Sequence, residues 1–293
     1  MKILVTGGAG FLGSHLVDTL VERGHVVTVL DREVPHQLPR GAVAIAGDLR
    51  DSAAVASAVA GHDAVYHLGG FADLNAARTR PLDTVQTNIV GTIHVLEAMR
   101  QHGIQRFLFA STAYVYSREG GFYRCSKQAC ESYIEEYGRA FDIRYTVIRY
   151  GSLYGPRADA TNGVYRLLRT AITEGRISYA GAPDDVREYI HVEDAARMSA
   201  DVLDDAFVGQ HVMLSGSSPT RAADLFMMFQ ELLGRKLEVQ YRRVEGPGSG
   251  HYAVTPYAYT PRAGRKLVTT HYVDMGQGLL TLVEQIHAEL DRA

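Results

Sequence analysis

The sequence predicts an α/β protein, built as a doubly wound parallel sheet with a second, smaller α/β lobe. Three observations carry this prediction. Short apolar runs alternate with amphipathic helical stretches over the first 150 residues, a glycine-rich turn follows the first run, and the alternation becomes irregular after Arg149. Such alternation is typical of a parallel sheet whose two faces are both covered by helices.

The individual elements follow from hydrophobic periodicity. Apolar runs rich in β-branched residues predict strands at 3–6, 26–30, 43–46, 64–67, 107–110 and 145–149. Apolar residues at helical spacing predict helices at 13–23, 53–60, 83–101 and 124–140. After residue 150, glycines and prolines divide the chain into short pieces. There we expect helices at 192–203 and 222–233, and an ordered loop region at 245–261.

Composition and charge exclude several classes of protein. Of the 293 residues, 46% are apolar and 22% are charged, which is ordinary for a globular chain with a sizeable core. The 30 basic and 33 acidic residues leave a net charge of −3, which argues against a general electrostatic grip on nucleic acid or an anionic membrane. No apolar stretch approaches the roughly 18 residues of a membrane span.

The two cysteines and the first residues indicate a reducing compartment. Cys125 and Cys130 lie five apart on a predicted helix, where they do not face each other, so no disulfide is expected. Residues 1–8 hold only three consecutive apolar residues, too few for the core of a secretory signal. We therefore expect a cytoplasmic protein that acts on small molecules.

A glycine-rich turn, T-G-G-A-G-F-L-G at 6–13, lies between the first predicted strand and the first predicted helix. Gly7 permits the tight turn, Gly10 lets the backbone approach a pyrophosphate, and Gly13 lets the helix pack closely on the strand. The free N–H groups at the start of the helix favour phosphate oxygens. Glycines alone could also mark an ordinary tight turn, but their position between a strand and a helix predicts a dinucleotide site of Rossmann type.

The end of the second strand predicts which dinucleotide is bound. Asp31 follows Gly13 by 18 residues, where a carboxylate can accept hydrogen bonds from the adenosine ribose hydroxyls. The same carboxylate would repel a ribose 2′-phosphate, although Arg32 follows it, so NAD is favoured over NADP. Asp48 and Leu49, at the end of the third strand, could reach the adenine.

A set of hydroxyl and amino groups near residue 120 predicts proton-transfer chemistry. Ser111 and Thr112 follow a predicted strand, at the end where open α/β sheets bind ligands. Tyr123 and Lys127 share one helix face. An ammonium beside a phenol lowers the phenol pKa from about 10, and a hydroxyl at Ser111 or Thr112 can hold the substrate oxygen. Alone, such a Tyr–Lys pair is usually a surface feature; after this nucleotide turn it predicts acid–base work on an alcohol beside a nicotinamide.

Taken together, these motifs make the chain resemble the extended short-chain dehydrogenase/reductase family, in particular its nucleotide-sugar epimerase and dehydratase branch. The resemblance covers nearly the whole chain. The matching segments are 6–13, Asp31, 47–51, 65–68, 88–92, Thr112, Tyr123, Lys127, R-Y-G-S-L-Y-G-P-R at 149–157 and R-E-Y-I-H-V-E-D at 187–194. The last two are specific to the sugar-nucleotide branch.

The resemblance implies roles for single residues. It makes Thr112, Tyr123 and Lys127 catalytic, and it makes Arg187 a ligand of a substrate phosphate, although an ion pair between the lobes is the alternative for Arg187. Ser152 stands where the family has the Asn that contacts the nucleotide diphosphate. The residues expected at the cofactor are Gly7, Gly10, Phe11, Leu12, Gly13, Asp31, Arg32, Asp48, Leu49, Leu68, Asn88, Ser111, Tyr123 and Lys127. The histidines show no ligand spacing, so no metal site is expected.

The resemblance also implies domains and partners. Residues 1–151, with about 187–215, would form the NAD-binding Rossmann domain, and residues 152–186, with about 216–293, the substrate-binding lobe. The expected substrate is a nucleotide sugar, with UDP as the preferred nucleotide. A homodimer is expected through the helices at 83–101 and 124–140. The residues proposed for its apolar stripe are Ile93, Leu96, Ala129 and Tyr133.

Two departures from the family pattern bear on the reaction. Only residues 113–122 separate Thr112 from Tyr123, far fewer than in the family, which predicts a more open site or a different cover. Family dehydratases place Asp-Glu directly after the catalytic Thr, whereas this chain has Ala113 and Tyr114. The sequence therefore favours inversion at carbon 4. A 4,6-dehydratase, a net reductase or dehydrogenase of a sugar or other alcohol or ketone, and a non-catalytic dinucleotide sensor stay open as alternatives.

Overall fold

The computed structural model describes residues 1–34, 38–242 and 254–256, which belong to one compact unit. The loop region predicted at 245–261, and most of the predicted lobe beyond residue 242, lie outside the described residues. Within them, Cys125 is exposed, Cys130 is buried, and both are free thiols, so the expectation of no disulfide between them is confirmed. None of the helices described is both long and apolar enough to cross a membrane.

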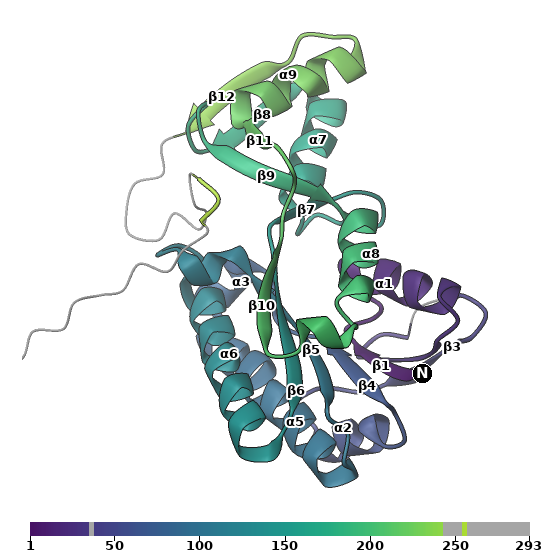
Figure 1. The fold of residues 1–293 in the computed structure, drawn as a ribbon. Helices are drawn as coiled ribbons and strands as arrows, with labels where there is room; N and C mark the ends of the chain where they lie inside the picture. The colour runs from purple at the N-terminus through teal and green to yellow at the C-terminus, as the bar shows by residue number, and fades with distance from the viewer. Residues whose placement is uncertain (35–37, 243–253, 257–293) are drawn as a thin grey trace, which may run out of the picture. The chain divides into compact units, whose positions relative to one another are not determined.

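The centre of the molecule is a parallel sheet of seven strands in the order β10-β6-β5-β4-β1-β2-β3 (Figure 1). Its strands are β1 (Lys2–Thr6), β2 (Val26–Asp31), β3 (Ala42–Ala46), β4 (Ala64–His67), β5 (Arg106–Thr112), β6 (Arg144–Tyr150) and β10 (Gln210–Leu214). The predicted fold class and all six predicted strands are confirmed. The sequence analysis missed β10, whose residues are only partly buried at the edge of the sheet.

Helices cover both faces of this sheet. The helices are α1 (Phe11–Glu22), α2 (Ser52–Val59), α5 (Gly91–His102), α6 (Gly121–Phe141) and α8 (Val192–Asp201). One core cluster joins the sheet to α1 and α8 and contains Leu16, Leu20 and Ala195. The other joins it to α2, α5 and α6 and contains Val55 and Ile134. Apolar residues at helical spacing therefore predicted these helices because their buried faces form the two cores.

The predicted helix at 83–101 is longer and less regular than expected. It consists of α4 (Pro81–Thr84), a π-helical turn η1 (Val85–Val90) and α5, and it follows a short helix α3 (Leu74–Thr79) that was not predicted. π-helical turns occur mainly at functional sites. Asn88, one of the residues expected at the cofactor, lies in this turn and is buried.

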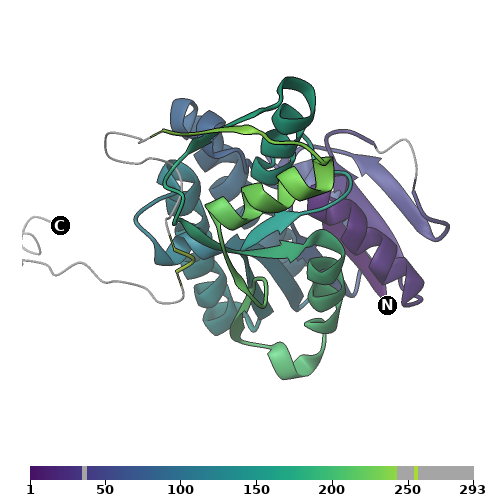
Figure 2. The ribbon, with the colours of Figure 1, turned by 90° about the horizontal axis from the view of Figure 1, so that it is seen from above.

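Up to residue 242, the described part of the second lobe consists of two small sheets and two helices. The first sheet has the order β11-β9-β7, and the second pairs β12 with β8. Their bounds are β7 (Ser152–Tyr154), β8 (Arg176–Ala180), β9 (Val186–His191), β11 (Pro219–Arg221) and β12 (Glu238–Arg242). Helices α7 (Gly163–Glu174) and α9 (Ala222–Leu233) pack against β8 and enclose a third core around Ile177, Phe226 and Phe229 (Figure 1; from above in Figure 2).

The path of the chain bears on the predicted domain boundaries, which stay a prediction. After β9, α8 and β10 return to the seven-stranded sheet and its core. Strand β9 itself pairs with β7 and β11 in the smaller sheet. The described residues also include two short 3₁₀ turns, η2 (Ala113–Tyr116) before α6 and η3 (Asp205–Phe207) before β10.

Candidate functional site

The glycine turn has the geometry that a bound pyrophosphate requires. Gly7 has a φ of +71°, and a Cβ there would lie 2.6 Å from the backbone nitrogen of Gly69. A Cβ on Gly13 would overlap the carbonyl oxygen of Gly7, so both positions need glycine. Gly10 caps α1 without a side-chain acceptor for the first helical N–H groups. These N–H groups fit phosphate oxygens.

Asp31 lies beside the glycine turn. Its Oδ2 accepts a hydrogen bond of 3.0 Å from the backbone of Ala9, and its Oδ1 accepts one of 2.7 Å from Arg32. Because a carboxylate has about four acceptor positions, these two bonds orient it and leave capacity for ribose hydroxyls. The residues present therefore fit a dinucleotide whose adenosine ribose reaches the end of β2.

Asp48 and Leu49, both predicted near the adenine, have different surroundings in the structure. Asp48 forms an ion pair of 2.6 Å with Arg50, and the hydrogen bond from Arg50 lowers the pKa of this carboxyl. Its carboxylate is therefore engaged by a neighbour that the sequence analysis did not consider. Leu49 is buried beneath Gly69 and Gly91, where it supports the turn rather than offering a polar contact.

Asn88 joins the loop after β4 to helix α6. Its Oδ1 accepts a bond of 2.6 Å from the backbone of Phe71, and its Nδ2 donates to the Phe71 carbonyl and to Ser126 Oγ at 2.8 Å. The amide is thus occupied within the protein. Leu68 continues β4 alongside β1, since its N–H bonds to the Thr6 carbonyl. Any contribution of Asn88 to NAD binding would come from holding this loop in place.

The structure brings the three predicted catalytic residues together at the carboxyl end of β5. Tyr123 lies close enough to Thr112 for the threonine side chain to lower the pKa of the phenol. Lys127 Nζ donates a bond of 2.7 Å to the Ala110 carbonyl and lies 5.9 Å from the centre of the Tyr123 ring. Lys127 is only 4% exposed, although it is an amine with no carboxylate partner within the described residues. A buried ammonium of this kind is typical of a ligand site.

The phenol pKa expected from the sequence is wrong for this structure. Burial raises the pKa of Tyr123 to about 12, although the side chain of Thr112 lowers it. Burial also lowers the pKa of Lys127, while the charge of Glu131 acts in the opposite direction. The ammonium is bonded to a backbone carbonyl and not to the phenol oxygen, so burial outweighs its effect on Tyr123.

Ser111 and Thr112 point in different directions, as neighbours on a strand do. Ser111 Oγ donates a bond of 2.5 Å to Glu131 Oε1, and Glu131 also forms a buried ion pair of 2.6 Å with Arg149. Thr112 is therefore the hydroxyl that meets Tyr123. The sequence analysis missed Glu131, although Glu131 follows Lys127 by four residues, as Lys127 follows Tyr123.

The short segment at 113–122 folds back on the start of α6. Arg124 Nη1 donates to the Ser117 carbonyl at 3.0 Å, and Gln128 Nε2 donates to the Val115 carbonyl at 2.8 Å. Phe122, which precedes Tyr123, is 50% exposed. Glu119 has a buried carboxylate oxygen with no hydrogen-bond partner in the part of the chain that the structure describes.

The predicted substrate residues lie on neighbouring strands of the second lobe. Ser152 on β7 is in register with Tyr189 on β9. Arg187 on β9 is hydrogen-bonded to Tyr179. The ring of His191 accepts a hydrogen bond from the N–H of Glu193 at the start of α8, so this histidine caps the helix.

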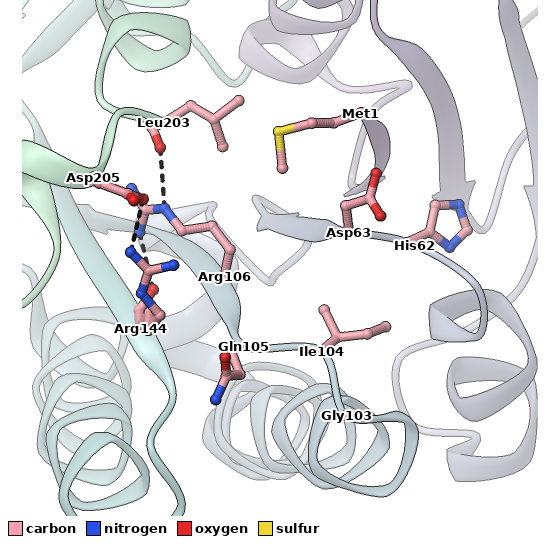
Figure 3. Close-up of a pocket in the computed structure, with 10 residues that line it drawn as sticks. All are labelled: Met1, His62, Asp63, Gly103, Ile104, Gln105, Arg106, Arg144, Leu203 and Asp205. Atoms are coloured by element: carbon pink, nitrogen blue, oxygen red, sulfur yellow. Dashed lines mark hydrogen bonds and ion pairs between the residues drawn. The ribbon is translucent and has the colours of Figure 1, made fainter.

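A cavity of about 360 Å³ lies at the opposite end of the sheet. Its lining residues are Met1, His62, Asp63, Gly103, Ile104, Gln105, Arg106, Arg144, Leu203 and Asp205 (Figure 3). They precede or begin β1, β4, β5 and β6, so the cavity is separated from the glycine turn by the length of the strands. No group of three or more possible metal ligands occurs within residues 1–34, 38–242 and 254–256.

A family model and several known proteins match this sequence. Residues 3–214 match the model of the NAD dependent epimerase/dehydratase family. A dTDP-glucose 4,6-dehydratase from Mycobacterium tuberculosis is 30% identical over 241 residues, covering 73% of this chain and 72% of that protein. A UDP-glucose 4-epimerase from Erwinia amylovora is 32% identical over 248 residues, covering 70% and 74%.

Solved structures show the same likeness. The UDP-glucose 4-epimerase of Thermotoga maritima, solved with UDP-glucose, has a TM-score of 0.78 and 28% identity over 89% of this chain and 90% of that one. The UDP-glucose 4-epimerase of Thermus thermophilus, solved with NAD, has a TM-score of 0.76 and 27% identity over 88% and 90%.

Proposed function

Because the chain belongs to the NAD-dependent epimerase/dehydratase family, we propose that it inverts carbon 4 of a nucleotide-linked hexose or hexuronic acid, with UDP as the nucleotide. One observation carries the choice of reaction. Thr112, which lies close to Tyr123, is followed directly by Ala113 and Tyr114, which supply no carboxylate for an elimination. The prediction of NAD as cofactor is confirmed by the family. The epimerases among the relatives support the proposed reaction, and the dehydratase keeps the alternative in view.

The residues of this chain would divide the work as follows. The turn at 6–13 and Asp31 bind the dinucleotide, which when bound accepts the hydrogen and two electrons that leave carbon 4. Thr112 holds the sugar 4-hydroxyl, and Tyr123 takes its proton. The positive charge of a bound cofactor would lower the pKa of Tyr123 from the value of about 12 that it has in the described structure.

Inversion then requires the sugar to present its other face. The 4-keto sugar turns within the site, regains the hydrogen at carbon 4 on the opposite side, and recovers a proton from Tyr123. The short segment at 113–122 and the exposed Phe122 support an open site with room for this rotation. We also propose that Arg187 and Ser152 bind the diphosphate, which stays fixed while the sugar turns.

A panel of nucleotide sugars, incubated with the NAD-loaded protein and followed by NMR, tests the reaction. We expect interconversion of a 4-epimer pair with no net change in NADH. Consumption of NADH in proportion to a reduced ketone would instead establish a net reductase.

A second candidate, a 4,6-dehydratase, is favoured by Glu119, whose buried carboxylate oxygen has no partner within the described chain. If Glu119 supplies the missing acid–base group, the same panel will release water and accumulate a 4-keto-6-deoxy sugar. Glu119→Gln will then abolish that product while leaving NAD binding intact. An epimerase will tolerate the same substitution.

We further propose that the protein is a cytoplasmic homodimer formed through α5 and α6. Tyr133 is 48% exposed, and Ile93 and Ala129 are partly exposed, as an interface requires. The prediction that Leu96 belongs to the same stripe is wrong, because this residue of α5 is fully buried in the core. The mass of one chain is 32.2 kDa, so light scattering at micromolar concentration separates a monomer from a dimer.

A further inference from the structure

Three contacts, two of them hydrogen bonds, connect consecutive residues of β5 to one face of α6. The pairs are Thr112 with Tyr123, Ala110 with Lys127, and Ser111 with Glu131. The helix residues are spaced by four, so they lie on one face of α6, one turn apart. Two of these pairs contain the proposed catalytic groups. The third pair has no role in the reaction described so far.

Glu131 is the most tightly held of the three helix residues. It is 6% exposed, and both its oxygens accept hydrogen bonds. Oε1 accepts from Ser111 Oγ at 2.5 Å and from Arg149 Nε at 3.0 Å, and Oε2 accepts from Arg149 Nη2 at 2.6 Å. An ionised carboxylate is an acceptor only, so the serine must donate its proton to it.

The carboxylate therefore ties three elements together, since Ser111 belongs to β5, Arg149 to β6 and Glu131 to α6. Arg149 also lies 4.6 Å from the centre of the Tyr116 ring and donates to His211 Nδ1 at 2.7 Å. A buried ion pair adds little net stability compared with apolar packing, but it imposes one geometry on the elements that it joins.

We propose that Glu131 is a positioning residue that fixes α6 against β5 through Ser111, and so sets where Tyr123 and Lys127 lie relative to Thr112 and to NAD. A displacement of about 1 Å in such a site costs on the order of 100-fold in rate. The expected effect on the rate rests on the proposed function. The expected effect on NAD affinity does not, because it is measured without any sugar.

Ser111→Ala tests this with the least disturbance, because it removes one hydroxyl and leaves the ion pair of Glu131 and Arg149 in place. We expect kcat to fall by about 10- to 100-fold with KM for the nucleotide sugar nearly unchanged. We expect the affinity for NAD to fall by about tenfold, measured by calorimetry without any sugar present. Ser111→Cys keeps a side chain of nearly the same size with a weaker donor. Its kcat and its NAD affinity should therefore lie between those of the wild type and those of Ser111→Ala.

The matched control is Glu136→Gln. Glu136 is on the same helix and pairs with Arg139, but both side chains are exposed, with 58% and 77% of their surface accessible. This substitution should leave kcat and NAD affinity unchanged. Circular dichroism and the unfolding midpoint establish the folded fraction of each variant.

The outcomes separate the positioning role from the proposed function. If Ser111→Ala keeps the kcat and NAD affinity of the wild type, or loses both only in proportion to its folded fraction, the positioning role is overturned while the epimerase proposal stands. If the wild type epimerises no sugar and Ser111→Ala still weakens NAD binding, the reaction is wrong and the positioning role stands.

Discussion

The two ends of the central sheet each hold a buried cation, and the two cations are bound in opposite ways. At the amino end, all five N–H groups of Arg106 donate to acceptors of the chain, among them the carbonyls of Leu203 and Val202 and the hydroxyl of Thr146 (Figure 3 shows the bond to Leu203). At the carboxyl end, Lys127 has three N–H groups. Within the described residues its hydrogen bond goes to the Ala110 carbonyl, and its Nζ also lies 4.5 Å from the centre of the Phe109 ring.

The difference shows how to recognise a ligand site among buried charges. Arg106 is saturated by β6 and by the segment between α8 and β10, so it holds these elements together and has no donor left for a ligand. Lys127 keeps donors available beside a phenol and a glycine turn. Buried polar groups in proteins are nearly always satisfied, so unused donors on a buried amine indicate that a bound molecule completes the site.

The largest effect should come from the group closest to the reacting oxygen. Tyr123→Phe removes the proton acceptor and keeps the ring, so we expect kcat to fall by about 10² to 10⁴-fold. Titration with NAD should give an affinity close to that of the wild type. A variant that retains more than a tenth of the wild-type rate would exclude Tyr123 as the acid–base group.

Replacing Arg106 and Lys127 in turn with methionine tests whether the two buried cations have different roles. Arg106→Met leaves several buried carbonyls without donors, so the free energy of unfolding should fall by about 2–4 kcal/mol in urea titrations. The rate per folded molecule should stay near the wild-type value. Lys127→Met should do the opposite, with a large loss of rate and of NAD affinity and little loss of stability. Equal losses of stability in both variants would contradict the distinction.

A further prediction concerns the buried carboxylate of Glu131 on α6 and the pH dependence of its contribution to stability. Burial alone would raise the pKa of Glu131, but its interactions with His211, Arg149 and Ser111 lower it to about 2 from an ordinary value of 4.5. Its stabilising contribution is therefore complete above about pH 4.5 and disappears as the pH falls towards 2. Between pH 6 and pH 3 the stability advantage of the wild type over Glu131→Gln should shrink by about 2 kcal/mol. An advantage that does not change between pH 6 and pH 3 would show that folding does not shift the pKa of this carboxyl.

The smallest expected effect concerns the other end of the dinucleotide. Asp31 accepts hydrogen bonds only from two backbone N–H groups among its described neighbours, so its remaining lone pairs are available to a ribose. Asp31→Asn removes the charge that repels a 2′-phosphate and weakens the bonds to ribose hydroxyls. We expect the preference for NAD over NADP to drop by about tenfold, since hydrogen bonds to a charged group contribute about 1.5–3 kcal/mol. If the wild type already binds NADP as tightly as NAD, the role assigned to Asp31 is wrong.

Local patterns were enough for much of this fold and for the parts of the site that lie within one turn or one helix. Apolar runs predicted six strands of the central sheet. Five of them are largely buried and therefore apolar, and the sixth, β3, is an exposed edge strand that nevertheless has an apolar run. The glycine turn at 6–13 and the spacing of Tyr123 and Lys127 needed only neighbouring residues, since each is a property of a single short segment. Strand β10 and the small strands of the second lobe were missed, because half-buried residues at sheet edges leave weak patterns.

The sequence by itself thus determined the doubly wound sheet and the glycine turn, and it supplied the residues proposed for acid–base work, all of which depend on contacts close along the chain. Only the tertiary structure decided that Ser111 turns to Glu131 while Thr112 meets Tyr123, that Asp48 is engaged by Arg50, and that Leu96 is core. It also decided that burial outweighs the neighbouring ammonium in setting the pKa of Tyr123. These outcomes depend on which distant segments meet and how completely they exclude water, and neither is encoded in the spacing of residues along the chain.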